Sequence, residues 1–298
     1  MTRILALTTA ILVMPALAAA QSLNFTSKDP NRPIEVTADQ GIEWQQSGRM
    51  FVARGNAKAK QNDMSVTADE LTAHYRDTRT GGTEVYRVDA VGNVTIASSS
   101  EQATGSSAVY DFDKEVLVIA GGPKPVTLTT ATGKVTAEDS IQYWQKEKVA
   151  VAQGNAEAQD ETRRIRADKL TAYFTDDNTA ASKDSTLKTG EIKLVQGEGN
   201  VTLRTAKETV KGTRGEYNRD TGIAKVEGNV TMVQGQNQIS GGFAVVDTKA
   251  GTSRLFGSAA EAKTASPRAD GRVRALIAPT PRSAADSAAP ETPAAPKR

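Results

Sequence analysis

The dipeptide Gly-Asn recurs five times in this chain, as Gly-Asn-Val-Thr at residues 92–95, 199–202 and 228–231 and as Gly-Asn-Ala at residues 55–57 and 154–156. Asn-Val-Thr matches an N-glycosylation acceptor, but recurrence in a fixed context indicates an architectural cause. With degenerate copies at Gly121 and Gly257, the phrase divides residues 34–261 into seven similar units. Units of this size indicate a repeat protein in which each unit buries its apolar face by stacking on its neighbours.

Apolar and polar residues alternate on either side of each repeated glycine. Because successive side chains of a strand point to opposite faces, this alternation indicates strands with one apolar and one solvated face. Polar turns such as "RDTRTGG" and "NRDTG" separate the strands. We therefore predict an all-β fold, a β-jellyroll or taco of about seven two-strand units with open ends. The inward residues, which would line a groove, are Phe51, Ala53, Val88, Val94, Ile96, Ala150, Ala152, Ala156, Ala158, Val195, Val201, Leu203, Val226, Val230 and Met232.

Glycine within a strand marks a bend, a bulge or a close backbone approach. We expect each repeated glycine to lie on the inward face, with its asparagine outward, so that the strand curves around a hollow. The short side chains of residues 150–158 are where we expect the space between sheets to remain unfilled. A close-packed sandwich core is the alternative. Trp44 and Trp144 are expected to occupy equivalent positions of their units and to serve packing.

The chain divides into three segments. Residues 1–20 read as a signal peptide, because Arg3 precedes an apolar run and small residues at Ala18 and Ala20 form a cleavage site. Residues 21–263 form the repeat domain, with a polar insert at 176–189. Residues 264–298 hold 6 of the 11 prolines and are expected to be a disordered Ala/Pro-rich tail.

Few residues are available for chemistry. His74 is the only histidine and there is no cysteine, which argues against Cys/His, Ser/His/Asp and His-rich metal sites. We interpret His74 as an exposed strand residue. The carboxylate pairs Asp111/Asp113 and Asp176/Asp177 lie in or beside turns, where Asp is common. A net charge of +2 without a basic stripe does not suggest nucleic-acid binding. We therefore predict no catalytic residue, no metal site and no cofactor.

The repeated "VTAD" and "V.GNV" segments and the short polar turns resemble the OstA-like family, in particular its LptA branch, over nearly all of residues 21–263. The resemblance implies a periplasmic lipopolysaccharide-transport protein that buries lipid A acyl chains inside the fold. It also implies head-to-tail self-association into a bridge from an LptC-like inner-membrane protein to an LptD-like outer-membrane protein, for outer-membrane assembly. Two alternatives stay open, a β-helical polysaccharide-active enzyme and a structural or adhesive repeat protein. Convergent outward carboxylates would favour the enzyme, and a solidly packed interior would favour the structural protein.

Overall fold

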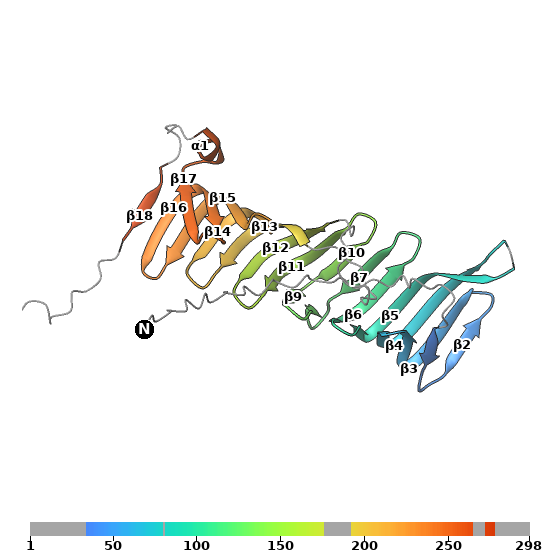
Figure 1. Ribbon diagram of the computed structural model, residues 1–298. Coiled ribbons are helices and arrows are strands. Elements are labelled where there is room, and N and C mark those ends of the chain that lie inside the picture. Colours follow the sequence, from blue (N-terminus) through green and yellow to red (C-terminus); the bar gives the residue numbers. More distant parts are fainter. Residues whose placement is uncertain (1–33, 80, 176–191, 265–271, 278–298) are drawn as a thin grey trace, which may run out of the picture.

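The computed structural model describes residues 34–79, 81–175, 192–264 and 272–277. The predicted signal peptide, the polar insert with Asp176/Asp177, and most of the predicted tail lie outside the described residues. The described strands form one 18-stranded antiparallel sheet, and a short helix, α1 (Ala259–Thr264), follows the seventeenth strand (Figure 1). The all-β prediction is confirmed. The strands are β1 (Glu35–Thr37), β2 (Ile42–Gln45), β3 (Met50–Gln61), β4 (Met64–Asp77), β5 (Thr83–Ala97), β6 (Gln102–Asp111), β7 (Val116–Ala120), β8 (Val126–Thr129), β9 (Lys134–Ala137), β10 (Ser140–Trp144), β11 (Val149–Gln159), β12 (Arg164–Phe174), β13 (Ile192–Arg204), β14 (Thr209–Asn218), β15 (Ile223–Gln234), β16 (Asn237–Asp247), β17 (Thr252–Phe256) and β18 (Arg274–Leu276).

The long strands bend near their middle, so that each contributes to two layers. The first half of β3 pairs with β2, whereas its second half pairs with β1. In the same way β6 pairs with β7 and β8, β11 with β10 and β9, and β16 with β17 and β18. We call the layer with β2, β7, β10 and β17 the first layer and the layer with β1, β8, β9 and β18 the second. The line of bends is the ridge, and the opposite side, where the hairpin turns of both layers lie, is the mouth.

Each repeated Gly-Asn forms a β-bulge at the ridge. Between the pairs Arg54↔Glu70 and Ala57↔Ala68, two residues of β3 oppose one residue of β4. Gly55 has φ 78° and Asn56 has φ 45°, and the other four Gly-Asn pairs also have positive φ at both residues. Glycine adopts this region freely and asparagine more readily than most residues. The extra residue bends the strand and carries it from one layer to the other.

The repeated glycine does not face inward as expected. A Cβ built at Gly92 or Gly199 would lie 2.1 Å from a carboxylate oxygen of the preceding strand, so only hydrogen fits beside that outer side chain. The neighbouring asparagine donates its side-chain N–H to a carboxylate in the same region. Four such bonds line the ridge, Asn56 to Asp39 (2.8 Å), Asn93 to Asp69 (3.0 Å), Asn155 to Glu138 (3.0 Å) and Asn200 to Asp168 (3.0 Å). The "VTAD" and "GN" segments recur together because they form one contact.

The two halves of the molecule repeat the same register. We call β1–β8 the N-terminal half and β9–β18 the C-terminal half. The pair Ala57↔Ala68 of β3 and β4 has its counterpart in Ala156↔Ala167 of β11 and β12. Likewise, β13 and β14 reproduce the register of β5 and β6. Residues of one half can therefore be compared with their counterparts in the other.

This register corrects the expectation for Trp144. Trp44 pairs with Phe51 and stacks on its ring at a centroid distance of 5.5 Å. The counterpart pair in β10 and β11 is Tyr143↔Ala150, so Trp144 lies one residue further along and on the opposite face. A shift of one residue reverses the face because side chains alternate along a strand. Trp144 is therefore not equivalent to Trp44.

Part of the predicted tail also differs from the expectation. Three residues of β18 pair with β16, from Gln238↔Leu276 to Ser240↔Arg274, and extend the second layer by one short strand. Backbone pairing to the free edge of β16 orders these residues although their side chains are exposed. Apart from Thr264 and residues 272–277, the predicted tail lies outside the described part of the chain.

Candidate functional site

The residues predicted to face inward lie between the two layers, and most are buried. Two apolar clusters form this interior. The first contains Ala53, Val94, Ile96, Ala152, Ala156 and Val201, and the second contains Leu203, Val226, Val230 and Met232. Ala150, Ala158 and Val195 are half-buried against the first cluster. Phe51 and Val88 are also half-buried, Phe51 against aromatic rings and Val88 in register with inward Ala73 and Tyr110.

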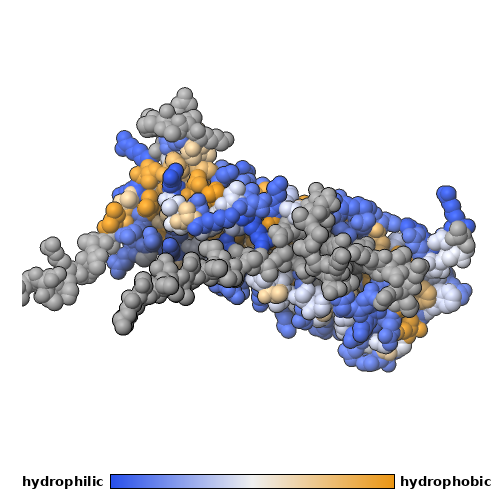
Figure 2. Space-filling model, viewed as in Figure 1, coloured by the Kyte–Doolittle hydropathy of each residue, from blue (hydrophilic) through white to orange (hydrophobic). Residues whose placement is uncertain are grey.

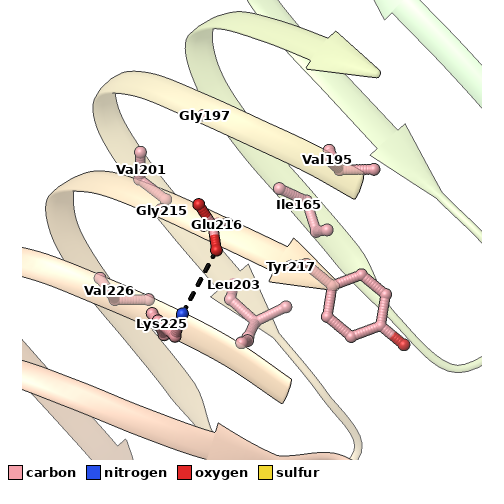
Figure 3. Close-up of a pocket in the computed structure, with 11 residues that line it drawn as sticks. Ile165, Val195, Gly197, Val201, Leu203, Gly215, Glu216, Tyr217, Lys225 and Val226 are labelled. Atoms are coloured by element: carbon pink, nitrogen blue, oxygen red, sulfur yellow. Dashed lines mark hydrogen bonds and ion pairs between the residues drawn. The ribbon is translucent and has the colours of Figure 1, made fainter. Parts of the chain in front are cut away.

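A hollow lies between the layers where the two clusters meet (Figure 3). Its apolar wall is formed mainly by Ile165, Val195, Val201, Leu203, Tyr217 and Val226. About 20 Å³ of it is open to a water-sized sphere, which is room for about one water molecule. The hollow is therefore a weak point in the packing. Any larger apolar group would require the layers to separate.

Two glycines face each other at the hollow. Gly197 of β13 pairs with Gly215 of β14, and both line it. The counterpart pair in the N-terminal half is Ala90↔Ala108, whose side chains are buried in the first cluster. Val201 packs closely against both glycines, since a Cβ at Gly197 would lie 3.2 Å from Val201 Cγ2 and one at Gly215 2.9 Å from Val201 Cγ1, so the hollow lies beside this contact. The residues 150–158, where we expected unfilled space, are instead packed, with Ala156 fully buried.

Alternation could have located these glycines. Gly197 lies two residues after inward Val195, so period-two counting places it on the same face. The sequence does not place Gly215 opposite it, because that pairing depends on the length of the turn between β13 and β14. Tyr217 and Ile165 were missed for the same reason.

The mouth of the N-terminal half is filled with aromatic rings. Phe51 and Tyr75 lie 5.1 Å apart between ring centroids, and Tyr110 meets Phe112 edge-on at 4.6 Å. Trp44 donates its indole N–H to the hydroxyl of Tyr75 at 2.8 Å. Burial raises the pKa of Tyr110 well above its ordinary value. These rings cover the mouth side of this half of the interior, while Trp44 remains exposed.

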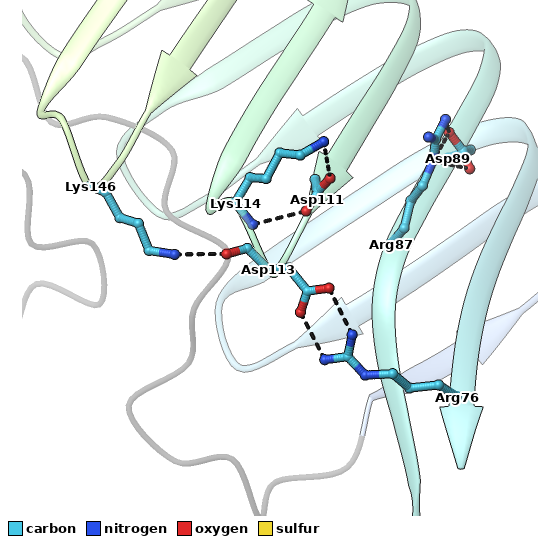
Figure 4. Close-up of polar contacts among 7 residues, drawn as sticks. All are labelled: Arg76, Arg87, Asp89, Asp111, Asp113, Lys114 and Lys146. Carbon is cyan, nitrogen blue, oxygen red and sulfur yellow. Dashed lines mark hydrogen bonds and ion pairs between the residues drawn. The ribbon is translucent and has the colours of Figure 1, made fainter. Parts of the chain in front are cut away.

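Charged side chains connect the first-layer turns of the N-terminal half to one another and to the turn between β10 and β11 (Figure 4). Arg76 donates from both Nη atoms to the carboxylate of Asp113, at 2.7 and 2.8 Å, and Lys146 donates to the Asp113 carbonyl oxygen at 2.7 Å. The Arg76 hydrogen bonds hold the pKa of Asp113 below its usual value. A hydrogen bond from the Lys114 backbone N–H lowers the pKa of Asp111. The Asp111/Asp113 pair therefore stabilises turns, as expected for Asp at these positions.

His74 differs from the expectation of an exposed residue. It is half-buried on the outer face, with Nε2 2.9 Å from Asp89 Oδ2, and Asp89 also accepts from Arg87 at 2.6 Å. Other carboxylates, of Glu138, Asp139 and Asp168, border a shallow polar notch at the ridge. Glu138 and Asp168 accept the asparagine bonds described above. Among the described residues, no group of three or more His, Cys, Asp or Glu is placed to hold a metal ion.

Both ends of the sheet expose apolar side chains. Ile42 and Trp44 are exposed at the N-terminal end, and Val273, Leu276 and Ile277 at the C-terminal end. Figure 2 shows apolar surface gathered around β16 and β17 in this view. Sheet edges with free backbone groups accept strands from other chains. None of the helices in the described ranges has the length and hydropathy needed to cross a membrane.

Comparison with known proteins identifies a family. The family model described as "LptA/(LptD N-terminal domain) LPS transport protein" matches the chain twice, over residues 35–139 and 134–252. The two matches correspond to the two halves that repeat the same register. An uncharacterized protein of Rhizobium meliloti (strain 1021) is 23% identical over 95 residues, which is 30% of this chain. The match spans 50% of the length of that curated relative.

Among solved structures, the chain is similar to LptH of Pseudomonas aeruginosa. That protein is described as the LptA homologous periplasmic component of the conserved lipopolysaccharide transport device. The TM-score is 0.39 and the sequence identity 18%, over 49% of this chain and 94% of LptH.

Proposed function

The chain belongs to the LptA/LptD N-terminal domain family of LPS transport proteins, and on that premise we propose that it is a periplasmic lipopolysaccharide carrier. Acyl chains of lipid A would lie between the two layers, while sugars and phosphates remain in water. The protein would act without catalysis, metal or cofactor. Lipid would move between aligned grooves, driven by energy supplied elsewhere.

The observation that carries the proposal is the hollow at Gly197 and Gly215, within an apolar interior that runs along the folded sheet. Burying a CH₂ group gains about 0.8 kcal/mol, so about ten buried groups of one acyl chain gain about 8 kcal/mol. That gain would offset the cost of separating the layers around the hollow. The alanine-lined remainder of the interior would then accept further chain length.

The open ends support the proposed partners. At the N-terminal end β2 closes the first layer and β1 the second, while β17 and β18 do so at the C-terminal end. Antiparallel addition of strands at these edges would align the interiors of successive molecules. We propose head-to-tail copies, an LptC-like protein and an LptD-like protein as the occupants of these edges.

The test is mass spectrometry of lipid extracted from the tagged protein after gentle purification from the periplasm. A periplasmic protein with the same tag is the control for carried-over lipid. Lipid A in near-stoichiometric amount, absent from the control, is the expected result. A lipid-free protein at good yield would contradict the proposal and favour a packed structural repeat.

A further inference from the structure

A polar bridge crosses the mouth beside the hollow. Arg163 Nη1 donates to the Tyr217 hydroxyl at 2.6 Å, and its guanidinium lies 5.4 Å from the centre of the Tyr217 ring. Tyr217 belongs to the wall of the hollow. The Arg163 side chain is only 16% exposed. A half-buried cation therefore contacts a residue in the wall of an apolar space.

The topology explains how these residues meet. Arg163 is the last residue of the turn between β11 and β12. Its carbonyl oxygen accepts a hydrogen bond from the backbone N–H of Asp160 at 2.9 Å. This turn lies on the mouth side of the second layer. Tyr217 precedes the last residue of β14 in the first layer. Both are at the ends of their layers farthest from the ridge. Their contact therefore joins the two layers across the mouth.

The N-terminal half has no cation at the corresponding position. Lys60↔Ser65 of β3 and β4 corresponds to Gln159↔Arg164 of β11 and β12, so Met64 is the counterpart of Arg163. Met64 is half-buried and packs against the first apolar cluster. In the N-terminal half, an apolar residue therefore occupies the position that Arg163 occupies in the C-terminal half. The cation occurs in the half that contains the hollow.

The surroundings of Arg163 leave it able to bind an anion. Asp160 Oδ2 lies 3.2 Å from both Nε and Nη2 of Arg163, and Asp160 Oδ1 accepts from the backbone N–H groups of Thr162 and Arg163. The carboxylate is therefore shared with the turn. A guanidinium carries five N–H groups in a planar fork that matches phosphate. Arg163 can thus hold Asp160 and still turn Nη1 from Tyr217 to a second acceptor.

We propose that Arg163 binds the phosphate of a phosphorylated acyl lipid at the mouth, while the acyl chains of that lipid occupy the hollow. This inference rests on the proposed carrier function. In the empty protein, the Arg163–Tyr217 contact holds the layers together. Arrival of a phosphate exchanges the neutral acceptor for a charged one, and hydrogen bonds between ions are the stronger kind. Breaking the bridge frees the layers to separate around the acyl chains.

The test compares lipid A carrying both phosphates with the same lipid A after phosphatase treatment. Affinity is measured by displacement of an apolar fluorescent dye, and loading rates by stopped flow. Arg163→Met gives the C-terminal half the residue of the N-terminal half. We expect roughly tenfold weaker binding of the phosphorylated lipid, as for loss of one charged hydrogen bond, and less than about twofold change for the dephosphorylated lipid.

Two further variants separate the effect of the Arg163–Tyr217 hydrogen bond from the effect of phosphate binding. Tyr217→Phe keeps the ring but removes the acceptor, so we expect faster loading of both lipids with the preference for phosphate retained. Arg164→Met is the matched control, because Arg164 is an exposed neighbour bonded to Glu157 and Gln159 on the outer face, and binding should not change. Thermal unfolding checks that each variant is folded.

Equal loss of both lipids in Arg163→Met, or an unchanged preference for phosphate, would overturn the inference and leave the carrier function standing. Uptake of neither lipid by the wild-type protein would overturn the carrier function, and this inference with it.

Discussion

The two halves of the molecule share one register but differ in how the interior is filled. In the N-terminal half, Ala90 faces Ala108 and both are buried. In the C-terminal half, Gly197 faces Gly215 beside a hollow. The strands β3 to β6 and their counterparts β11 to β14 share strand register and ridge bulges. The same strand register therefore accommodates an alanine pair in one half and a glycine pair beside a hollow in the other.

The mouths differ around Tyr217, the counterpart of Tyr110, although the C-terminal half also carries aromatic pairs such as Tyr143 and Phe174 at 5.9 Å. Aromatic rings, including Tyr75, Tyr110 and Phe112, close the N-terminal half. In the C-terminal half, Tyr217 is held by a polar bridge to Arg163, a contact that one competing anion can break. The difference between the halves therefore lies at Tyr217 and at the glycine pair Gly197 and Gly215.

The largest effect is expected from a charge placed in either interior. Val94 and Val226 are buried in the first and second clusters. Asp at either position should abolish lipid loading, because a carboxylate without a partner opposes burial of an acyl chain. Val94→Asp should lower the free energy of unfolding more than Val226→Asp, since the hollow gives the second carboxylate access to water.

Denaturant unfolding and lipid extraction measure both effects. Val91→Asp is the control, because Val91 is exposed on the outer face and should tolerate the charge. Normal loading in a folded Val226→Asp protein would count heavily against the carrier function.

The next effect comes from exchanging the small residues between halves. A Cβ built at Gly197 lies 3.2 Å from Val201 Cγ2, and one at Gly215 lies 2.9 Å from Val201 Cγ1. Alanine at both positions should fill the hollow and weaken loading roughly tenfold, which corresponds to about 1.4 kcal/mol. The free energy of unfolding should change by less than about 1 kcal/mol, since alanine restricts the unfolded chain while crowding Val201.

The reverse exchange, Ala90→Gly with Ala108→Gly, should destabilise the protein by about 2 kcal/mol through lost packing and backbone entropy. Its loading should not fall. If alanine in the C-terminal half leaves loading intact, the hollow is not where the lipid enters.

The smallest effect concerns pH and the closed mouth. Burial raises the pKa of Tyr110, so its hydroxyl stays protonated in the folded protein at pH values where the unfolded chain ionises. The stability that this group contributes is complete below about pH 10 and is lost as pH rises above it. Tyr110→Phe should flatten the fall of the melting temperature between about pH 9 and 11. Tyr173→Phe, at an exposed position, should leave the fall of the melting temperature unchanged. Equal slopes of melting temperature against pH in both variants would show that water reaches Tyr110 at the mouth.

Much of the interior could be predicted from local pattern. Alternation around each Gly-Asn phrase placed all fifteen proposed groove residues at buried or half-buried positions, because period two is a property of the strand itself. The same rule failed for Trp144, since the preceding corner at 138–139 carries no information on register. It also misplaced the repeated glycines, because a bulge breaks the alternation at that residue.

The sequence by itself determined the strands, their inward faces and the positions of the bends, since each depends on neighbouring residues and on the φ that Gly and Asn accept. Only the tertiary structure decided that Gly197 faces Gly215, that Asn56, Asn93, Asn155 and Asn200 each bond a carboxylate of the preceding strand or strand piece, and that Arg163 reaches Tyr217. These contacts join residues between 17 and 54 positions apart. Turn lengths and the folding of the sheet set such distances, and alternation along a single strand does not encode them.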